Sequence, residues 1–192
     1  MPTKWSQDLY IQAYRFAAQA HWEKAQLVPG TQIPYLMHFS FVAMEIIAAL
    51  AVESIADGDL AVQCALLHDT LEDTDATHDD LANKFGSNVA DAVAALTKDE
   101  TIGAESKDKW QRKVLQMADS LKRIKSQPRE IWMVKLADRI TNLQPPPHFW
   151  TMDKVKRYKQ ESIKIYETLK NGSSFLSDRL KGKIYSYQYL GD

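Results

Sequence analysis

Apolar residues recur every three or four positions through most of the chain, which is the spacing typical of helices. The pattern predicts helices over residues 5–25, 35–54, 59–69, 78–85, 88–97, 107–125, 129–143, 153–170 and 175–190. No alternation of apolar and polar residues persists, and no internal repeat is visible. We therefore predict an all-α fold with one domain over residues 1–192. Its core covers about 5–166, and the C-terminal helices, residues 153–190, pack on that core.

Polar caps and helix breakers lie between these segments. Asp57, Thr77 and Ser87 are predicted to cap the helices that follow them, because short polar side chains accept hydrogen bonds from free backbone N–H groups. Gly86 is expected to end one helix, and the three prolines at 145–147 to end another.

Composition narrows the class of protein. With 45% hydrophobic and 26% charged residues, the chain is typical of soluble globular domains. The net charge of −1 argues against general binding to nucleic acid or membranes. A single cysteine, Cys64, excludes an internal disulfide and fits a reducing compartment. The N-terminus lacks the pattern of a signal peptide, so we expect a cytoplasmic protein.

Charge is distributed unevenly along the chain. Residues 57–80 contain eight acidic residues and no Lys or Arg, whereas residues 98–125 contain eight basic and five acidic residues. An acidic centre facing a basic arm suits a metal ion and a phosphate-bearing ligand. Solvated helix faces would account for any individual charge equally well.

The stretch from Ala65 to Thr74 places four ionisable residues beside leucines. On a continuous helix, His68 and Glu72 lie about 40° apart, with Asp69 and Asp73 beside them. Burying carboxylates next to apolar side chains is costly unless a positive charge compensates them. A divalent metal ion would provide that charge.

A second polar pair and a second histidine extend this set. Asp138 and Asn142 are spaced i, i+4 on an otherwise apolar helix, and His38 lies among hydrophobic neighbours. Taken alone, His38 could be an ordinary core histidine, and Asp138 could pair with Lys135 or Arg139.

Taken together, His38, His68, Asp69 and Asp138 offer two imidazoles and two carboxylates from three helices. This mixed set of nitrogen and oxygen donors suits Mn²⁺, Fe²⁺ or Zn²⁺ better than Mg²⁺. Such an ion lowers the pKa of bound water and neutralises phosphate charge. Glu72 and Asp73 follow closely enough to orient that water or accept its proton.

The ordered motifs resemble the HD-domain metal-dependent phosphohydrolases. The longer strings resemble more specifically the hydrolase domain of the Rel/SpoT alarmone enzymes, including the stand-alone small alarmone hydrolases and the metazoan SpoT homologue. The strings that carry this resemblance are Pro34-Tyr-Leu-Met-His38, Ala65-Leu-Leu-His-Asp-Thr-Leu-Glu-Asp-Thr74, Phe85-Gly86 with Leu96-Thr97, and Lys135-Leu-Ala-Asp-Arg-Ile-Thr-Asn-Leu143. The resemblance runs from about Trp5 to Tyr166 and implies an HD-type helical bundle with a metal site between helices.

The resemblance also implies an activity and roles for these residues. It implies one Mn²⁺ bound by His38, His68, Asp69 and Asp138, with Glu72 and Asp73 activating the water. The family reaction removes pyrophosphate from the 3′ position of guanosine tetra- and pentaphosphate (ppGpp and pppGpp), leaving GDP or GTP. The residues expected to contact the nucleotide are Asn142, Lys98, Lys107, Lys109 and Arg112. The chain has no room for the synthetase domain of the long enzymes, so hydrolysis alone is expected.

Two departures from the family pattern bear on the substrate. An Arg-Lys pair that packs on guanine usually precedes the Pro-Tyr motif, but residues 26–33 here contain no basic residue. After Asn142, Gln144-Pro-Pro replaces the usual Arg-Thr-Leu. Adenosine alarmones (ppApp-type), or NADPH as substrate of a 2′-phosphatase, are therefore alternative substrates. A non-catalytic nucleotide sensor is a third hypothesis, and the oligomeric state, monomer or homodimer, stays open.

Overall fold

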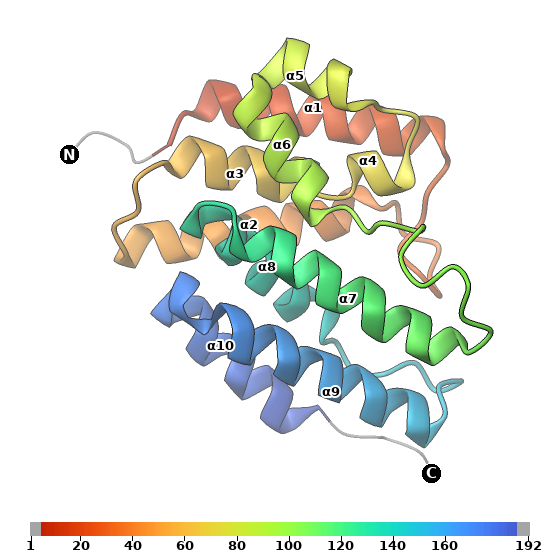
Figure 1. Ribbon diagram of the computed structural model, residues 1–192. Helices are drawn as coiled ribbons and strands as arrows, with labels where there is room; N and C mark the ends of the chain where they lie inside the picture. The colour runs from red at the N-terminus through yellow and green to blue at the C-terminus, as the bar shows by residue number, and fades with distance from the viewer. Residues whose placement is uncertain (1–4, 188–192) are drawn as a thin grey trace.

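The regular structure of residues 5–187, the part described by this computed structural model, is helical apart from one isolated β-bridge between Leu27 and Pro34 (Figure 1). The elements are α1 (Gln7–Glu23), α2 (Leu36–Val52), α3 (Gly58–Leu67), α4 (Thr70–Asp73), α5 (His78–Phe85), α6 (Ser87–Leu96), α7 (Lys109–Lys125), α8 (Arg129–Asn142), α9 (Met152–Leu169), the 3₁₀ turn η1 (Lys170–Gly172) and α10 (Ser174–Ser186). The all-α prediction is confirmed. The last predicted helix ends at Ser186, and its residues 188–190 lie outside the described part.

Helix α3 lies at the centre of the fold. It packs against α1, α2 and α8, and nearly all of its residues are buried. A helix that is apolar on all sides must be covered on all sides. Asp57 caps its first turn as predicted, by accepting a hydrogen bond from the backbone N–H of Leu60. This cap fixes the start of α3 near the surface, and the buried run that follows leads to Leu67 inside the molecule.

The helix predicted over residues 59–69 ends two residues early, at Leu67, and the continuous helix used to relate His68 to Glu72 is wrong, because α4 begins separately at Thr70. Two side chains form hydrogen bonds with backbone carbonyl groups at this helix end. His68 Nδ1 lies 2.9 Å from the Ala65 carbonyl oxygen, and Thr70 Oγ1 donates to the Leu67 carbonyl at 2.7 Å. Local hydrogen bonds of this kind compete with helix continuation. Consequently, the two carboxylates of α4 do not share a helix face with His68.

Two of the remaining predicted boundaries are confirmed, and one is wrong by a residue. Thr77 and Asp80 form a reciprocal capping box at the start of α5. Gly86 ends α5 with a φ of 89°, a conformation that glycine adopts without steric cost. Gly86, rather than Ser87, occupies the N-cap position of α6, since Ser87 is already helical.

The C-terminal helices form a layer against α8 (Figure 1). Helix α10 packs on α8 and α9, and Arg179 reaches α2, where its Nε lies 2.5 Å from Oε2 of the buried Glu45. Of the three C-terminal tyrosines, Tyr187 is buried and Tyr185 is 85% exposed, while Tyr189 lies outside the described residues. No helix within residues 5–187 combines the length and the apolar character needed to span a bilayer.

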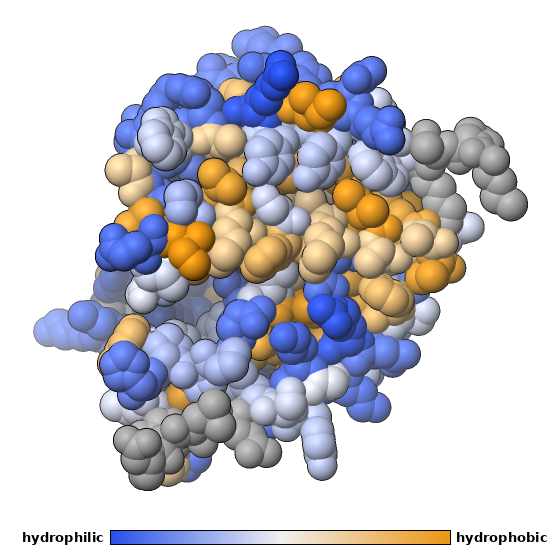
Figure 2. All heavy atoms as spheres, turned by 180° about the vertical axis from the view of Figure 1, so that it is seen from behind, coloured by the Kyte–Doolittle hydropathy of each residue, from blue (hydrophilic) through white to orange (hydrophobic). Residues whose placement is uncertain are grey.

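The two faces of α2 differ in their exposure to solvent. Its inner face carries the buried His38 and Phe39. Its outer face exposes Leu36, Phe41 and Met44, and Figure 2, which views the molecule from behind, shows an apolar band on this side. Helix α2 thus delivers His38 to the interior, where α3 and α8 also meet.

Candidate metal centre

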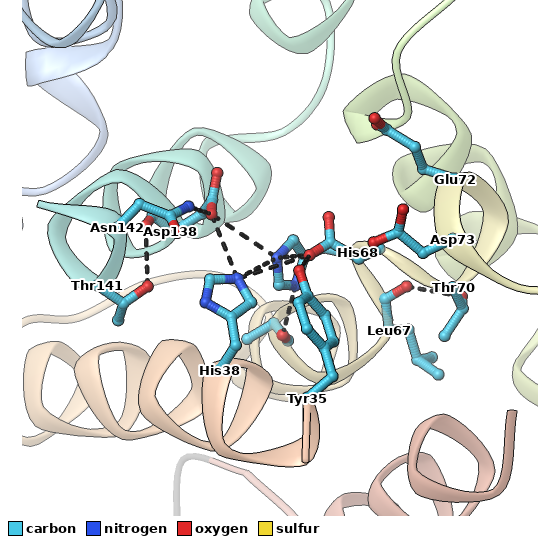
Figure 3. A network of polar contacts seen from close by, with 12 residues as sticks. Tyr35, His38, Leu67, His68, Thr70, Glu72, Asp73, Asp138, Thr141 and Asn142 are labelled. Atoms are coloured by element: carbon cyan, nitrogen blue, oxygen red, sulfur yellow. Dashed lines mark hydrogen bonds and ion pairs between the residues drawn. The ribbon is translucent and has the colours of Figure 1, made fainter. Parts of the chain in front are cut away.

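Side chains from three separate parts of the chain converge where α2, the end of α3 and α8 meet (Figure 3). The donor atoms of His38, His68 and Asp69 all lie within 4.8 Å of one another. The Nε2 atoms of the two histidines are 3.2 Å apart, and His68 Nε2 is 2.9 Å from Asp69 Oδ2. Asp138 completes the group, with Oδ1 3.5 Å from His38 Nε2 and 3.8 Å from His68 Nε2. The four residues that the sequence indicated are therefore neighbours in space.

Further hydrogen bonds orient these donor atoms. His68 Nδ1 forms a hydrogen bond with the Ala65 carbonyl, and this contact leaves Nε2 facing the cluster. The Tyr35 hydroxyl donates to Asp69 Oδ2. Asp138 accepts from Lys135 Nζ at 2.9 Å on Oδ2 and from Asn142 Nδ2 at 2.5 Å on Oδ1. Such outer contacts hold metal ligands in a fixed rotamer and tautomer.

Electrostatics favour a positive charge at this position. Burial disfavours charge on His68, but the Asp69 carboxylate outweighs burial and raises the pKa of His68 to about 9. Burial opposes ionisation of Asp69, yet the His68 charge reverses this effect and lowers the pKa of Asp69 to about 2. The Lys135 ammonium likewise outweighs burial and holds the pKa of Asp138 well below its usual range. The cluster thus combines ionised carboxylates with a protonated imidazole, whose charge a divalent cation can replace.

The donor set fits a divalent metal ion. One proton can bridge the two facing imidazole Nε2 atoms, and a divalent cation between them would take its place by accepting both lone pairs. Two buried carboxylates add negative charge and oxygen donors. Mixed imidazole and carboxylate sites hold metals such as Mn²⁺, Fe²⁺ and Zn²⁺.

The two acidic residues of α4 point in different directions (Figure 3). Asp73 is turned toward the cluster, and its Oδ2 accepts from Gln26 Nε2 at 2.9 Å. Glu72 is turned away and accepts from both the backbone N–H and the ammonium of Lys98, at 3.1 and 3.4 Å. Burial and the nearby carboxylates raise the pKa of Asp73. Asp73 is accordingly the better placed of the two to exchange a proton near the cluster.

A cleft of about 480 Å³ adjoins the cluster between α7, α8 and α9. Its basic lining residues are Lys98, Lys109, Arg112, Lys113, Lys135 and Arg139. Three of the four basic residues that the sequence nominated thus line this cleft, whereas Lys107 is not among its lining residues. The guanidinium group of Arg112 is engaged with the carbonyl oxygens of Gly103, Ala104 and Ser106. Lys98 shares its ammonium between Glu72 and Glu100.

Sequence reasoning missed several residues of this region. Tyr35 and Gln26 were not considered as partners of Asp69 and Asp73, and Arg139 was considered only as a partner of Asp138. Arg139 follows Asp138 directly and Lys135 precedes it by three residues, so helical spacing could have pointed to a basic face. For Tyr35 and Gln26 no sequence spacing relates them to their partners, which lie 34 and 47 residues away.

Comparison with known proteins gives a consistent result. The HD domain family matches residues 13–173 of this chain. The guanosine-3′,5′-bis(diphosphate) 3′-pyrophosphohydrolase MESH1 of Xenopus tropicalis is 31% identical over 176 residues, covering 90% of each chain. The human protein of the same name is 32% identical over 176 residues, covering 89% of this chain and 90% of its own.

Longer proteins and a solved structure match as well. The guanosine-3′,5′-bis(diphosphate) 3′-pyrophosphohydrolase of Aquifex aeolicus is 31% identical over 182 residues, but this match spans only 23% of that protein. A solved structure, described as a metazoan orthologue of SpoT that hydrolyses ppGpp, superposes with a TM-score of 0.74 at 26% identity. The superposition covers 94% of this chain and 96% of that one. The cluster, the fold and these relatives agree that the chain belongs to the HD domain family.

Proposed function

We propose that this protein is a metal-dependent phosphohydrolase that removes the 3′-pyrophosphate of ppGpp and pppGpp, yielding GDP or GTP and pyrophosphate. The observation that carries the proposal is the convergence of His38, His68, Asp69 and Asp138 beside a basic cleft. Relatives named as 3′-pyrophosphohydrolases, with 31 and 32% identity and nearly full mutual coverage, support the choice of reaction.

In this proposal, His38, His68, Asp69 and Asp138 hold one Mn²⁺ ion, with Fe²⁺ or Zn²⁺ as alternatives. A bound ion of this kind lowers the pKa of water and neutralises phosphate charge. The protein's part is to keep the four donors fixed, through Tyr35 on Asp69 and Lys135 on Asp138.

Proton transfer is assigned to the acidic residues of α4. The attacking water forms a bond to the phosphorus attached to the 3′-oxygen and gives its proton to Asp73, while the bond from phosphorus to the 3′-oxygen breaks. The 3′-oxygen then takes up a proton and leaves as a hydroxyl group. Glu72 anchors Lys98 at the mouth of the cleft, since both nitrogen atoms of that lysine contact its carboxylate.

Substrate binding is assigned to the cleft and to the end of α8. Asn142, which contacts Asp138, would bind the nucleotide. Lys98, Lys109 and Arg112 line the cleft and would face phosphate oxygens, and Lys107 is kept as a candidate from the adjoining loop. Guanidinium and ammonium groups are the usual phosphate partners in proteins.

An adenine nucleotide is the second candidate substrate, because the loop before α2 lacks the cationic pair that would select guanine. Where the family has a cationic pair, this loop exposes Leu27 and Ile33, and a side chain at Gly30 would lie 3.7 Å from Phe149. Apolar and aromatic groups stack on any base and do not select guanine. Adenosine alarmones and NADPH, from which a 2′-phosphate would be cleaved, therefore belong in the same assay.

The decisive experiment measures product release with Mn²⁺ and a panel of ppGpp, pppGpp, ppApp and NADPH. Pyrophosphate from ppGpp supports the proposal, whereas a preference for ppApp or single phosphate from NADPH supports the second candidate. Asp69→Ala is the matched variant, because it removes one proposed ligand. A sensor would release no phosphate in either form and would retain nucleotide affinity after this substitution.

Location and assembly belong to the same proposal. We propose a cytoplasmic protein with a single domain, whose partner is a small nucleotide rather than nucleic acid or a membrane. The sole cysteine, Cys64, is a buried free thiol, which fits a reducing compartment. Light scattering would decide between monomer and homodimer.

A further inference from the structure

A buried histidine on α1 is linked to Asp73 through one glutamine. His21 Nδ1 lies 2.5 Å from Gln26 Oε1, and Gln26 Nε2 lies 2.9 Å from Asp73 Oδ2. His21 is 3% exposed and lies outside the proposed ligand set. The three side chains come from α1, the loop that follows it, and α4, and α1 packs directly against α4.

The chemistry of these groups fixes the direction of each hydrogen bond. An ionised carboxylate only accepts, so the amide nitrogen of Gln26 faces Asp73 and its oxygen faces His21. His21 must then carry a proton on Nδ1 in order to donate to that oxygen. The chain therefore runs in one direction, from the His21 N–H through the Gln26 amide to the Asp73 carboxylate.

Packing and backbone contacts hold His21 and Gln26 in place. The His21 ring lies against Tyr35 and Phe39, with centroid distances of 4.9 and 5.7 Å. The Gln26 backbone N–H donates to the His21 carbonyl at 3.1 Å, and its own carbonyl accepts from the Tyr35 N–H at 3.0 Å. Tyr35 in turn donates to Asp69. Gln26 is thus fixed by its backbone to the same residue that orients a proposed metal ligand.

Asp73 is an exposed residue in the last position of α4, which is only four residues long. A carboxylate on so short a helix has several rotamers available, and Gln26 is the side chain that holds it in the observed one. A general base must lie within hydrogen-bond reach of the proton it accepts. The rotamer of Asp73 therefore controls whether this carboxylate can act as the general base.

We propose that His21 and Gln26 are positioning residues, which hold Asp73 in the rotamer that accepts the proton of the attacking water. This inference rests on the proposed hydrolase function. It adds two residues that do not contact the proposed metal ligands through their side chains.

The kinetic test compares Gln26→Met and His21→Leu with the wild-type protein on whichever nucleotide the wild type hydrolyses. Misplacing a catalytic group by about 1 Å costs up to about 100-fold, so we expect kcat to fall about 10- to 100-fold. KM, bound metal per chain and melting temperature are expected to stay unchanged. His21→Asn restores an N–H near the position of Nδ1 and should recover part of the loss seen in His21→Leu.

The matched control is Gln19→Met, since Gln19 lies on α1 but its amide donates to the exposed Glu23. This variant should behave as wild type. The inference is overturned if Gln26→Met keeps its kcat, or if the loss in kcat is matched by loss of metal or stability. It is equally overturned if His21→Asn is as impaired as His21→Leu.

A crystal structure of Gln26→Met provides a readout that needs no activity. We expect Asp73 to leave its rotamer or occupy several, while His68 and Asp69 stay in place. An unchanged Asp73 would overturn the inference even if the wild type hydrolyses ppGpp. Conversely, a wild type that hydrolyses none of the nucleotides would refute the proposed function, and the Asp73 rotamer would still decide the positioning role.

Discussion

Three of the four residues proposed to bind metal also make polar contacts with other parts of the protein. His68 contacts the Ala65 carbonyl, Asp69 accepts from Tyr35, and Asp138 accepts from Lys135. The contacts of His68 and of Lys135 leave His68 Nε2 and Asp138 Oδ1 facing the cluster, whereas Tyr35 donates to the same Asp69 oxygen that faces the histidines. Because the site is preformed by these contacts, we expect its affinity for metal to depend on protons and on outer hydrogen bonds.

Metal binding should release protons at neutral pH. The pKa of His68 is raised to about 9, so at pH 7 the metal-free protein carries a proton on this imidazole. A metal ion must displace that proton in order to bind. Apparent metal affinity should therefore rise about tenfold per pH unit up to about pH 9 and level off above it. Titration calorimetry in buffers of different ionisation enthalpy measures the protons released. A binding constant independent of pH between 6 and 8 would contradict this assignment.

Tyr35→Phe should weaken metal binding without unfolding the protein. The substitution removes the hydroxyl that donates to Asp69 but keeps the ring that packs on His38 and His21. Loss of an outer partner of a metal ligand typically lowers affinity about 10- to 100-fold. Competition with a fluorescent chelator measures the change. Tyr14→Phe is the control, because the Tyr14 hydroxyl accepts a hydrogen bond from Ser40, which is not a proposed metal ligand.

At the scale of elements, helices could be predicted because their periodicity is local, whereas their ends often depend on neighbours. The capping box of Thr77 and Asp80 lies within four residues and was predictable. The end of α3 was not, since it depends on hydrogen bonds that His68 and Thr70 make in a buried setting. The same break separates Glu72 from the cluster and directs it to Lys98.

A packing contact between η1 and α8 gives a prediction at this scale. A Cβ atom at Gly172 would lie 2.9 Å from the Cβ of Trp132, so Gly172→Ala forces the turn away from α8. Overpacking of this kind typically costs about 1–3 kcal/mol of unfolding free energy. Urea denaturation measures it.

Gly182→Ala is the matched substitution for that experiment. Gly182 lies inside α10 with no neighbouring atom within 4 Å of the added methyl group. Alanine in a helix interior should stabilise the protein by about 0.5–1 kcal/mol. Equal effects of the two substitutions would contradict the packing described for η1.

At the scale of the whole molecule, the cluster joins elements that are distant in sequence. His38 comes from α2, His68 and Asp69 from the segment between α3 and α4, and Asp138 from α8. These helices also share one apolar core, which α9 and α10 extend. A ligand bound by all three segments is therefore coupled to unfolding of the entire core.

Chelation should lower the melting temperature without dividing the transition. A metal present at 100 times its Kd stabilises the folded state by about 2.7 kcal/mol. For a domain of this size, that corresponds to a shift of roughly 5–10 °C. Calorimetry with Mn²⁺ and with EDTA measures the shift. Two separate transitions would contradict the single-domain organisation that we propose.

The sequence by itself determined the helical class, most helix positions and the four residues that form the cluster. Helical periodicity and cap chemistry act within a few residues, and a His-Asp pair with its partner motifs is recognisable by residue type alone. The roles proposed for those residues rest on the resemblance of these motifs to the HD-domain phosphohydrolases.

Only the tertiary structure decided which groups surround the cluster. Asp69 meets Tyr35 and Asp73 meets Gln26 because α1, α2 and α4 pack together, not because of any spacing along the chain. Glu72 and Asp73 are successive residues of α4, and the packing of that segment places Lys98 beside the first and Gln26 beside the second. Hydrogen bonds between distant segments depend on angles and distances that local sequence patterns do not encode.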